Sequence, residues 1–101
     1  MKANVYFTRE ITPEKVVELY HALGVQLPGK VAVKVHSGEK GNQNFLRPEF
    51  WRPMVEAVHG TVVECNTAYG DAAGGVRDHT ESHRRLLEEH GWTKYFDVDL
   101  M

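Results

Sequence analysis

The chain has 101 residues, 42% hydrophobic and 26% charged, which is the composition of one ordinary globular domain. A formal net charge of −2 and a pI near 6.3 argue against a nucleic-acid partner, since such proteins usually carry a basic face. No apolar run approaches the roughly 20 residues of a membrane span, and the N-terminus has no apolar signal region. We therefore expect no membrane partner. The single cysteine cannot form an internal disulfide, which fits a reducing compartment, so the chain is predicted to be cytoplasmic.

The first third of the chain predicts a strand and a helix. Residues 3–8 (ANVYFT) are rich in strand formers. Residues 12–14 (TPE) supply a cap, a proline suited to the first helical position and an acid for the positive end of the dipole. Apolar residues then recur at i, i+3, i+4 and i+7, as Val16, Leu19, Tyr20 and Leu23. Because Gly24 is a natural stop, we expect a helix over about residues 13–23.

A second strand is predicted over residues 30–36, after the turn signal Pro28-Gly29. Alternate side chains of a strand point to opposite faces. One face therefore carries Val31, Val33 and Val35, and the other carries Ala32, Lys34 and His36. A polar loop over residues 37–45 follows the strand.

Residues 46–58 favour helix, but Pro53 removes a backbone bond to Glu49. Either a short turn at residues 48–51 precedes a helix from about residue 52, or one helix bends there. Phe50, Met54 and Val58 repeat every four residues and are expected to face the core, with Val55 beside them.

The last part of the chain predicts a strand at residues 61–65, a long loop at 66–76, and a helix from residue 78 or 80 to about 90. A final strand is expected at residues 94–100. This alternation predicts a single α/β domain over residues 1–101. We expect a three-layer, Rossmann-like arrangement, with a mainly parallel sheet of about four strands and helices on its faces. Ligands of such sheets bind outside the carboxyl ends of the strands, where the loops after residues 36 and 65 begin.

The loop after the second strand carries candidate chemistry. A lysine on a buried strand must find an anion or lose its proton, so Lys34 could bind an anionic group or act as a base. His36 could shuttle a proton or bind a metal, and Glu39 could be an acid or base. The alternative is an edge strand with Lys34 in water, His36 bonded to a loop carbonyl and Glu39 solvated. The glycines around Gly38 predict a tight turn with exposed amides.

The second loop and the helix after it supply further polar groups. Asn66 and Thr67 could bind a ligand or simply structure the loop, and Arg77 could bind an anion. His79 and His83 are spaced i and i+4 on one helix, a geometry that chelates metals if His36 supplies a third ligand. The alternative is a half-buried helix face. Cys65 is either a nucleophile or an inert buried thiol.

Several motifs carry a resemblance to a known family. They are VAVKVHSGEKGN (residues 31–42), FLRPEF (45–50), Arg52-Pro53, Asn66-Thr67-x-Tyr69, Arg77, His83 and EHGW (89–92). Together they resemble the domain-of-unknown-function family three-sixty-two, often described as iron–sulfur-centre proteins. The resemblance implies an α/β domain whose signature residues meet at one site: Lys34, His36, Gly38, Glu39, Asn66, Thr67, Arg77 and His83.

Many members of that family are longer and carry a cysteine cluster for iron–sulfur centres. With Cys65 alone, this chain looks like a short version, and no iron–sulfur cluster is expected in it by itself.

Three functional hypotheses follow. In the first, the rim binds an anionic small molecule or cofactor, with acid–base chemistry by Lys34, His36 and Glu39 and binding by Gly38, Asn66, Thr67, Arg77 and His83. In the second, the chain is a non-catalytic subunit or fragment that completes its sheet with another copy or a partner. In the third, His36, His79 and His83 bind a metal.

Overall fold

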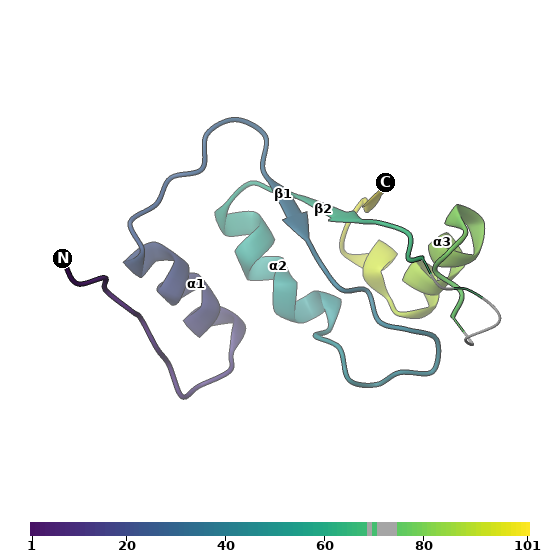
Figure 1. The fold of residues 1–101 in the computed structure, drawn as a ribbon, viewed down its shortest axis with the longest axis horizontal. Coiled ribbons are helices and arrows are strands. Elements are labelled where there is room, and N and C mark those ends of the chain that lie inside the picture. The colour runs from purple at the N-terminus through teal and green to yellow at the C-terminus, as the bar shows by residue number, and fades with distance from the viewer. Residues whose placement is uncertain (69, 71–74) are drawn as a thin grey trace.

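The computed structural model describes residues 1–68, 70 and 75–101 (Figure 1). Tyr69 and residues 71–74, which belong to the predicted loop after residue 65, lie outside this description. In chain order the elements are α1 (Pro13–Ala22), β1 (Ala32–Lys34), α2 (Pro48–Ala57), β2 (Thr61–Glu64), α3 (Thr80–Glu89), the 3-10 helix η2 (Trp92–Lys94) and β3 (Asp99–Leu100).

The sheet confirms the predicted α/β class. Its strands are parallel in the order β1-β2-β3, with Val33 beside Val62 and Val63 beside Asp99. The described residues form three strands rather than about four, because the predicted strand at residues 3–8 is absent, and the predicted last strand is present but shorter. No helix within the described ranges is long and apolar enough to cross a membrane.

The predicted strand at residues 3–8 is wrong. This segment is not part of the sheet, and Val5 and Phe7 are 89% and 80% exposed. Strand-forming side chains favour a strand only where a neighbouring strand and a covered face are available. Here the segment runs beside α1, away from β1 (Figure 1).

The predicted final strand is shorter than expected. Gly91 adopts a left-handed conformation with φ of 82°, and the chain then turns through η2, where Phe96 N–H donates to the carbonyl of Trp92. The buried Trp92 anchors this turn, so only residues 99–100 extend beside β2.

The first two helices follow the sequence signals. The hydroxyl of Thr12 accepts from Lys15 N–H at 3.2 Å and begins α1, which ends at Ala22 as predicted. The second helix is one continuous helix that contains Pro53, so the single-helix alternative is the observed one.

The hydrophobic core lies between the sheet and helices α2 and α3. Its buried members are Val35, Val55, Val62, Leu87, Trp92, Val98 and Leu100. β1 is shorter than the strand predicted over residues 30–36, but burial still alternates along that segment, since Val35 is buried while Lys34 and His36 are exposed. The core therefore covers one face of β1 and leaves the opposite face of that strand open.

Candidate functional site

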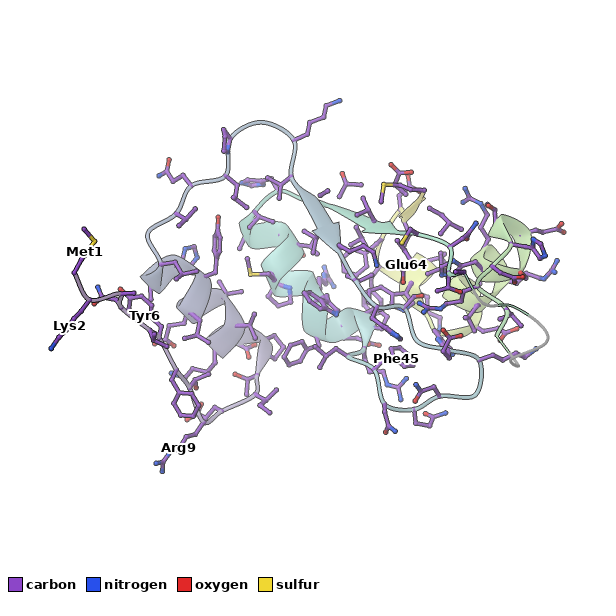
Figure 2. The ribbon with its side chains drawn as sticks, in the orientation of Figure 1. Met1, Lys2, Tyr6, Arg9, Phe45 and Glu64 are labelled. Atoms are coloured by element: carbon purple, nitrogen blue, oxygen red, sulfur yellow. The ribbon has the colours of Figure 1, made fainter. Side chains whose placement is uncertain are left out.

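The two loops predicted to carry the site begin at one edge of the sheet. β1 ends at Lys34 and β2 ends at Glu64, and these ends are neighbours because the strands are adjacent and parallel. The segment leading into α3 reaches the same edge. Figure 2 shows Glu64 in the half of the molecule that holds α3, well away from Tyr6 and Arg9.

The carboxylate of Glu64 is the centre of a buried polar network and is 1% exposed. Two backbone N–H groups donate to it, Ser37 at 2.9 Å and Cys65 at 3.0 Å. Its ion-pair partners are Arg77, at 3.2 Å, and Lys34. Burial alone would raise the pKa of Glu64, but Lys34 and the two amides favour the anion and lower that pKa to about 2. This carboxylate is therefore charged at neutral pH.

Lys34 has the anionic partner that its place on the strand requires. Its ammonium donates to Glu64 and to the carbonyl of Val35, at 2.7 Å, while its side chain stays half exposed. An ammonium has three donors. The structure gives it these two partners among the described residues, and Lys34 is the most exposed charged member of the network, ahead of Glu39.

Arg77 ties the two loops together and is 5% exposed. Two nitrogens of its guanidinium contact the same oxygen of Glu39: Nε donates to it at 2.8 Å, and Nη2 lies 2.7 Å from it. The other terminal nitrogen pairs with Glu64, and the carbonyl of Arg77 accepts from Thr67 N–H at 2.8 Å. With Lys34 included, two cations face two carboxylates, so the network is close to neutral.

Ser37, which the sequence analysis did not single out, bonds to several parts of the site. Its N–H donates to Glu64, and its carbonyl accepts from His90 Nδ1 at 2.9 Å and from Trp92 Nε1 at 3.0 Å. These bonds join the loop after β1 to β2 and to the turn after α3. The sequence did contain one signal for a role of Ser37 in the site: it directly follows the predicted strand over residues 30–36 and precedes Gly38.

The side chain of Ser37 belongs to a relay of three buried or half-buried groups. Its hydroxyl lies 3.1 Å from His83 Nε2, and His83 Nδ1 lies 3.1 Å from Asn66 Oδ1. The amide nitrogen of Asn66 donates to Thr80, so its oxygen accepts from His83 Nδ1–H. Nε2 then carries the lone pair that accepts from the hydroxyl. Burial lowers the pKa of His83, which keeps this imidazole neutral.

This relay has the arrangement of a hydroxyl, a base and a group that orients the base. It can move a proton between Ser37 and His83. Both side chains are 0% exposed, so the relay is closed to solvent in this conformation.

The structure brings most of the predicted site residues together. Five side chains meet in the network: Lys34, Glu39, Asn66, Arg77 and His83. Thr67 joins it through its backbone, and Gly38 makes the turn with φ of 90°. Three residues that the sequence analysis considered are exposed instead: His36, Cys65 and His79.

His36 lies beside the network rather than in it. Its Nδ1 accepts a hydrogen bond from Gly38 N–H at 3.0 Å. The alternative interpretation of the sequence expected His36 to donate to a loop carbonyl instead. The ring borders a hollow of about 260 Å³ between the loop after β1 and α2.

The three histidines predicted to bind a metal do not converge. His83 uses both ring nitrogens in the relay, and His79 has a 76% exposed side chain that pairs with Asp78 at 3.4 Å. Within the described residues, no group of three or more His, Cys, Asp or Glu side chains is placed to hold a metal ion. The geometry gives the metal hypothesis no support.

Fold and site together define a small α/β domain whose parallel sheet carries a buried ion network at its carboxyl edge. The chain belongs to the family described as a domain of unknown function, DUF362, whose model matches residues 31–99. The match includes every residue of the network and confirms the resemblance seen in the sequence. No curated protein and no solved structure matches the chain.

Proposed function

We propose that this domain binds an anionic small molecule or cofactor at the carboxyl edge of its sheet, with the ammonium of Lys34 as the charged contact. One observation carries the proposal: the half-exposed Lys34 is paired with Glu64, a carboxylate that is 1% exposed. Such a pair is a poor means of stabilising a fold, because desolvation opposes the attraction. Fixed charge in strongly perturbed surroundings is typical of functional sites.

The network supports this contact by holding both loops. Arg77 joins Glu39 of the first loop to Glu64 at the end of β2, and Ser37 fixes the chain directly after β1. A ligand at Lys34 would therefore meet groups already in place and would pay little ordering entropy.

In this proposal the imidazole of His36 is the group that donates or accepts a proton. Lys34, at the end of β1, and His36, just beyond it, are both exposed, and two residues of extended chain span about 7 Å. His36 is exposed, so its imidazole can exchange protons with water, whereas His83 is closed off. A ligand anchored on Lys34 would lie within reach of that imidazole.

The test is a titration of the ¹⁵N-labelled protein with inorganic phosphate and with pyruvate, followed by amide chemical shifts at constant ionic strength. Saturable shifts are expected at Lys34 and at the end of β2, around Cys65. Lys34→Met should abolish them, and Lys40→Met, at an exposed loop position, should not. Shifts that do not saturate, or that survive in Lys34→Met, would sink the proposal.

A second candidate function is association with another copy or with a partner subunit. Helix α1 has no buried residue, and apolar side chains around it are exposed, namely Val5, Phe7, Ile11, Leu23, Val25 and Leu27. β1 is an edge strand of the described sheet. Both features favour a surface that another chain covers.

Light scattering across a concentration series tests this candidate. A dimer mass is expected, with Phe7→Glu shifting the protein toward monomer. Arg9→Glu introduces the same side chain at a nearby exposed polar position and should leave the mass unchanged. A monomer at all concentrations would exclude pairing between copies.

A further inference from the structure

The hollow beside His36 is a separate feature from the ion network. It has a volume of about 260 Å³ and is lined by His36, Asn42, Asn44, Phe45, Leu46 and Trp51. None of these side chains is acidic, and none is a charged member of the network. Pockets for drug-sized ligands have about 300–1,000 Å³, so this hollow suits a molecule of about one ring.

Two polar groups of the hollow, His36 and Asn42, present donors. Because His36 Nδ1 accepts from Gly38 N–H, the neutral imidazole carries its hydrogen on Nε2 and donates from there. The amide oxygen of Asn42 accepts from Asn44 N–H at 2.7 Å, which leaves its amide nitrogen as the donating end. A ligand that fits these groups must bring hydrogen-bond acceptors.

A fixed positive charge lies next to the hollow. The guanidinium of Arg47 is 4.1 Å from the centroid of the Phe45 ring, and Gln43 holds it through two acceptors, at 2.9 and 3.1 Å. Phe45 also stacks on His90, with centroids 4.6 Å apart. Phe45 therefore has a guanidinium and an imidazole against its ring, and its ring edge carries partial positive charge.

We propose that this hollow binds a small planar carboxylate, a single aromatic or heteroaromatic ring that carries one carboxyl group. The carboxylate accepts from His36 Nε2–H and Asn42, with the charge of Arg47 nearby. The ring packs against the half-buried Trp51 and the edge of Phe45. This site borders the proposed site at Lys34 and shares His36 with it, but Lys34 does not line the hollow, whereas Asn42 and Trp51 do.

The two tryptophans provide a direct readout with benzoate and nicotinate as probes. Trp51 lies in the hollow, whereas Trp92 is 0% exposed in the core. In a titration of the ¹⁵N-labelled protein, the indole N–H signal of Trp51 should shift and saturate while that of Trp92 stays in place. Acetate lacks the ring, benzamide lacks the charge and cyclohexanecarboxylate is not planar, so each should bind at least several-fold more weakly.

Variants locate the binding groups. His36→Ala should weaken benzoate binding about tenfold, the expected loss of a charge-assisted hydrogen bond. His21→Ala, an exposed histidine at the end of α1, is the matched control and should bind as the original protein does. Asn42→Ala is a second variant that leaves the imidazole in place and should also weaken binding.

Inorganic phosphate, which has no ring, should shift the signals at the end of β2 but not the indole signal of Trp51, which separates this site from the proposed anion site. An unmoved Trp51 signal with both aromatic probes would overturn the proposal. So would equal binding of acetate and benzoate, or full binding by both His36→Ala and Asn42→Ala.

Discussion

The hydroxyl of Ser37 lies 3.1 Å from Nε2 of His83, although the two residues are 46 positions apart in the chain. Both side chains are completely buried, and the contact joins the loop after β1 to α3. Around it, the carboxylate of Glu64 collects the donors of both loops. Stability and ligand binding should therefore depend on the same small set of groups.

Ser37→Ala should lower the free energy of unfolding by about 1–3 kcal/mol, because His83 Nε2 loses its donor in a buried position. Denaturant unfolding measures the change. Thr8→Ala removes an exposed hydroxyl that bonds only within its own turn, and should change stability by less than about 0.5 kcal/mol. Equal effects of the two variants would contradict a structural role for the relay.

Glu64→Gln should destabilise the fold by about 3–5 kcal/mol, because it leaves the buried Arg77 without one of its two counter-charges. The matched control is Glu56→Gln, which breaks the exposed pair with Arg52 and should cost at most about 1 kcal/mol. Thermal and denaturant unfolding compare the two. A loss for Glu64→Gln no larger than the control would mean that the network carries little of the stability.

Stability should fall as the solution is acidified. The pKa of Glu64 is about 2 in the folded protein and has an ordinary value of 4.5. Between these values the unfolded chain binds more protons. The contribution of Glu64, about 3 kcal/mol, is therefore present above pH 4.5 and lost as the pH falls toward 2. Burial lowers the pKa of His83 below its ordinary value of 6.5, so the loss from this group begins below pH 6.5.

Unfolding free energies measured from pH 8 to pH 3 test this dependence. The original protein should lose stability throughout the acid range, and Glu64→Gln should show a flatter curve below pH 4.5. Parallel curves for the two proteins would show that Glu64 does not have the lowered pKa.

Gly38→Ala should be more damaging than Gly41→Ala. Both glycines have positive φ, 90° and 76°, so an alanine is strained at either position. At Gly38 the added methyl would also lie 2.5 Å from the ring of Phe45, whereas at Gly41 no atom lies within 4 Å. The difference in unfolding free energy between the two variants measures the cost of the contact with the Phe45 ring. In a Phe45→Ala background, that difference should become smaller.

His59→Gly should stabilise the protein by up to about 1 kcal/mol. His59 follows α2 with φ of 50°, and the N–H groups of His59 and Gly60 donate to the carbonyls of Glu56 and Val55. This is the helix-ending motif in which glycine is usual. The same substitution inside α1, His21→Gly, should instead destabilise by up to about 1 kcal/mol. Calorimetry that finds the same sign for both variants would contradict this explanation.

Local signals in the sequence were enough for the helices and for the two paired strands β1 and β2, but not for residues 3–8, which form no strand. The cap at Thr12, the apolar spacing in α1 and the stop at Gly91 depend on neighbours within a few positions, so they can be read from the chain itself. The alternation along β1 likewise predicted which side chains are buried. Because parallel strands end at a common edge, the sequence also predicted that Lys34, Arg77 and His83 would approach one another.

Tertiary structure alone decided the partners within that edge. Glu64 resembles any strand residue until Lys34, Ser37 and Arg77 surround it, and burial together with that pairing sets its pKa. Ser37 became a centre of the site through Trp92, 55 positions away. Such contacts arise between distant segments after packing, and no local spacing encodes them.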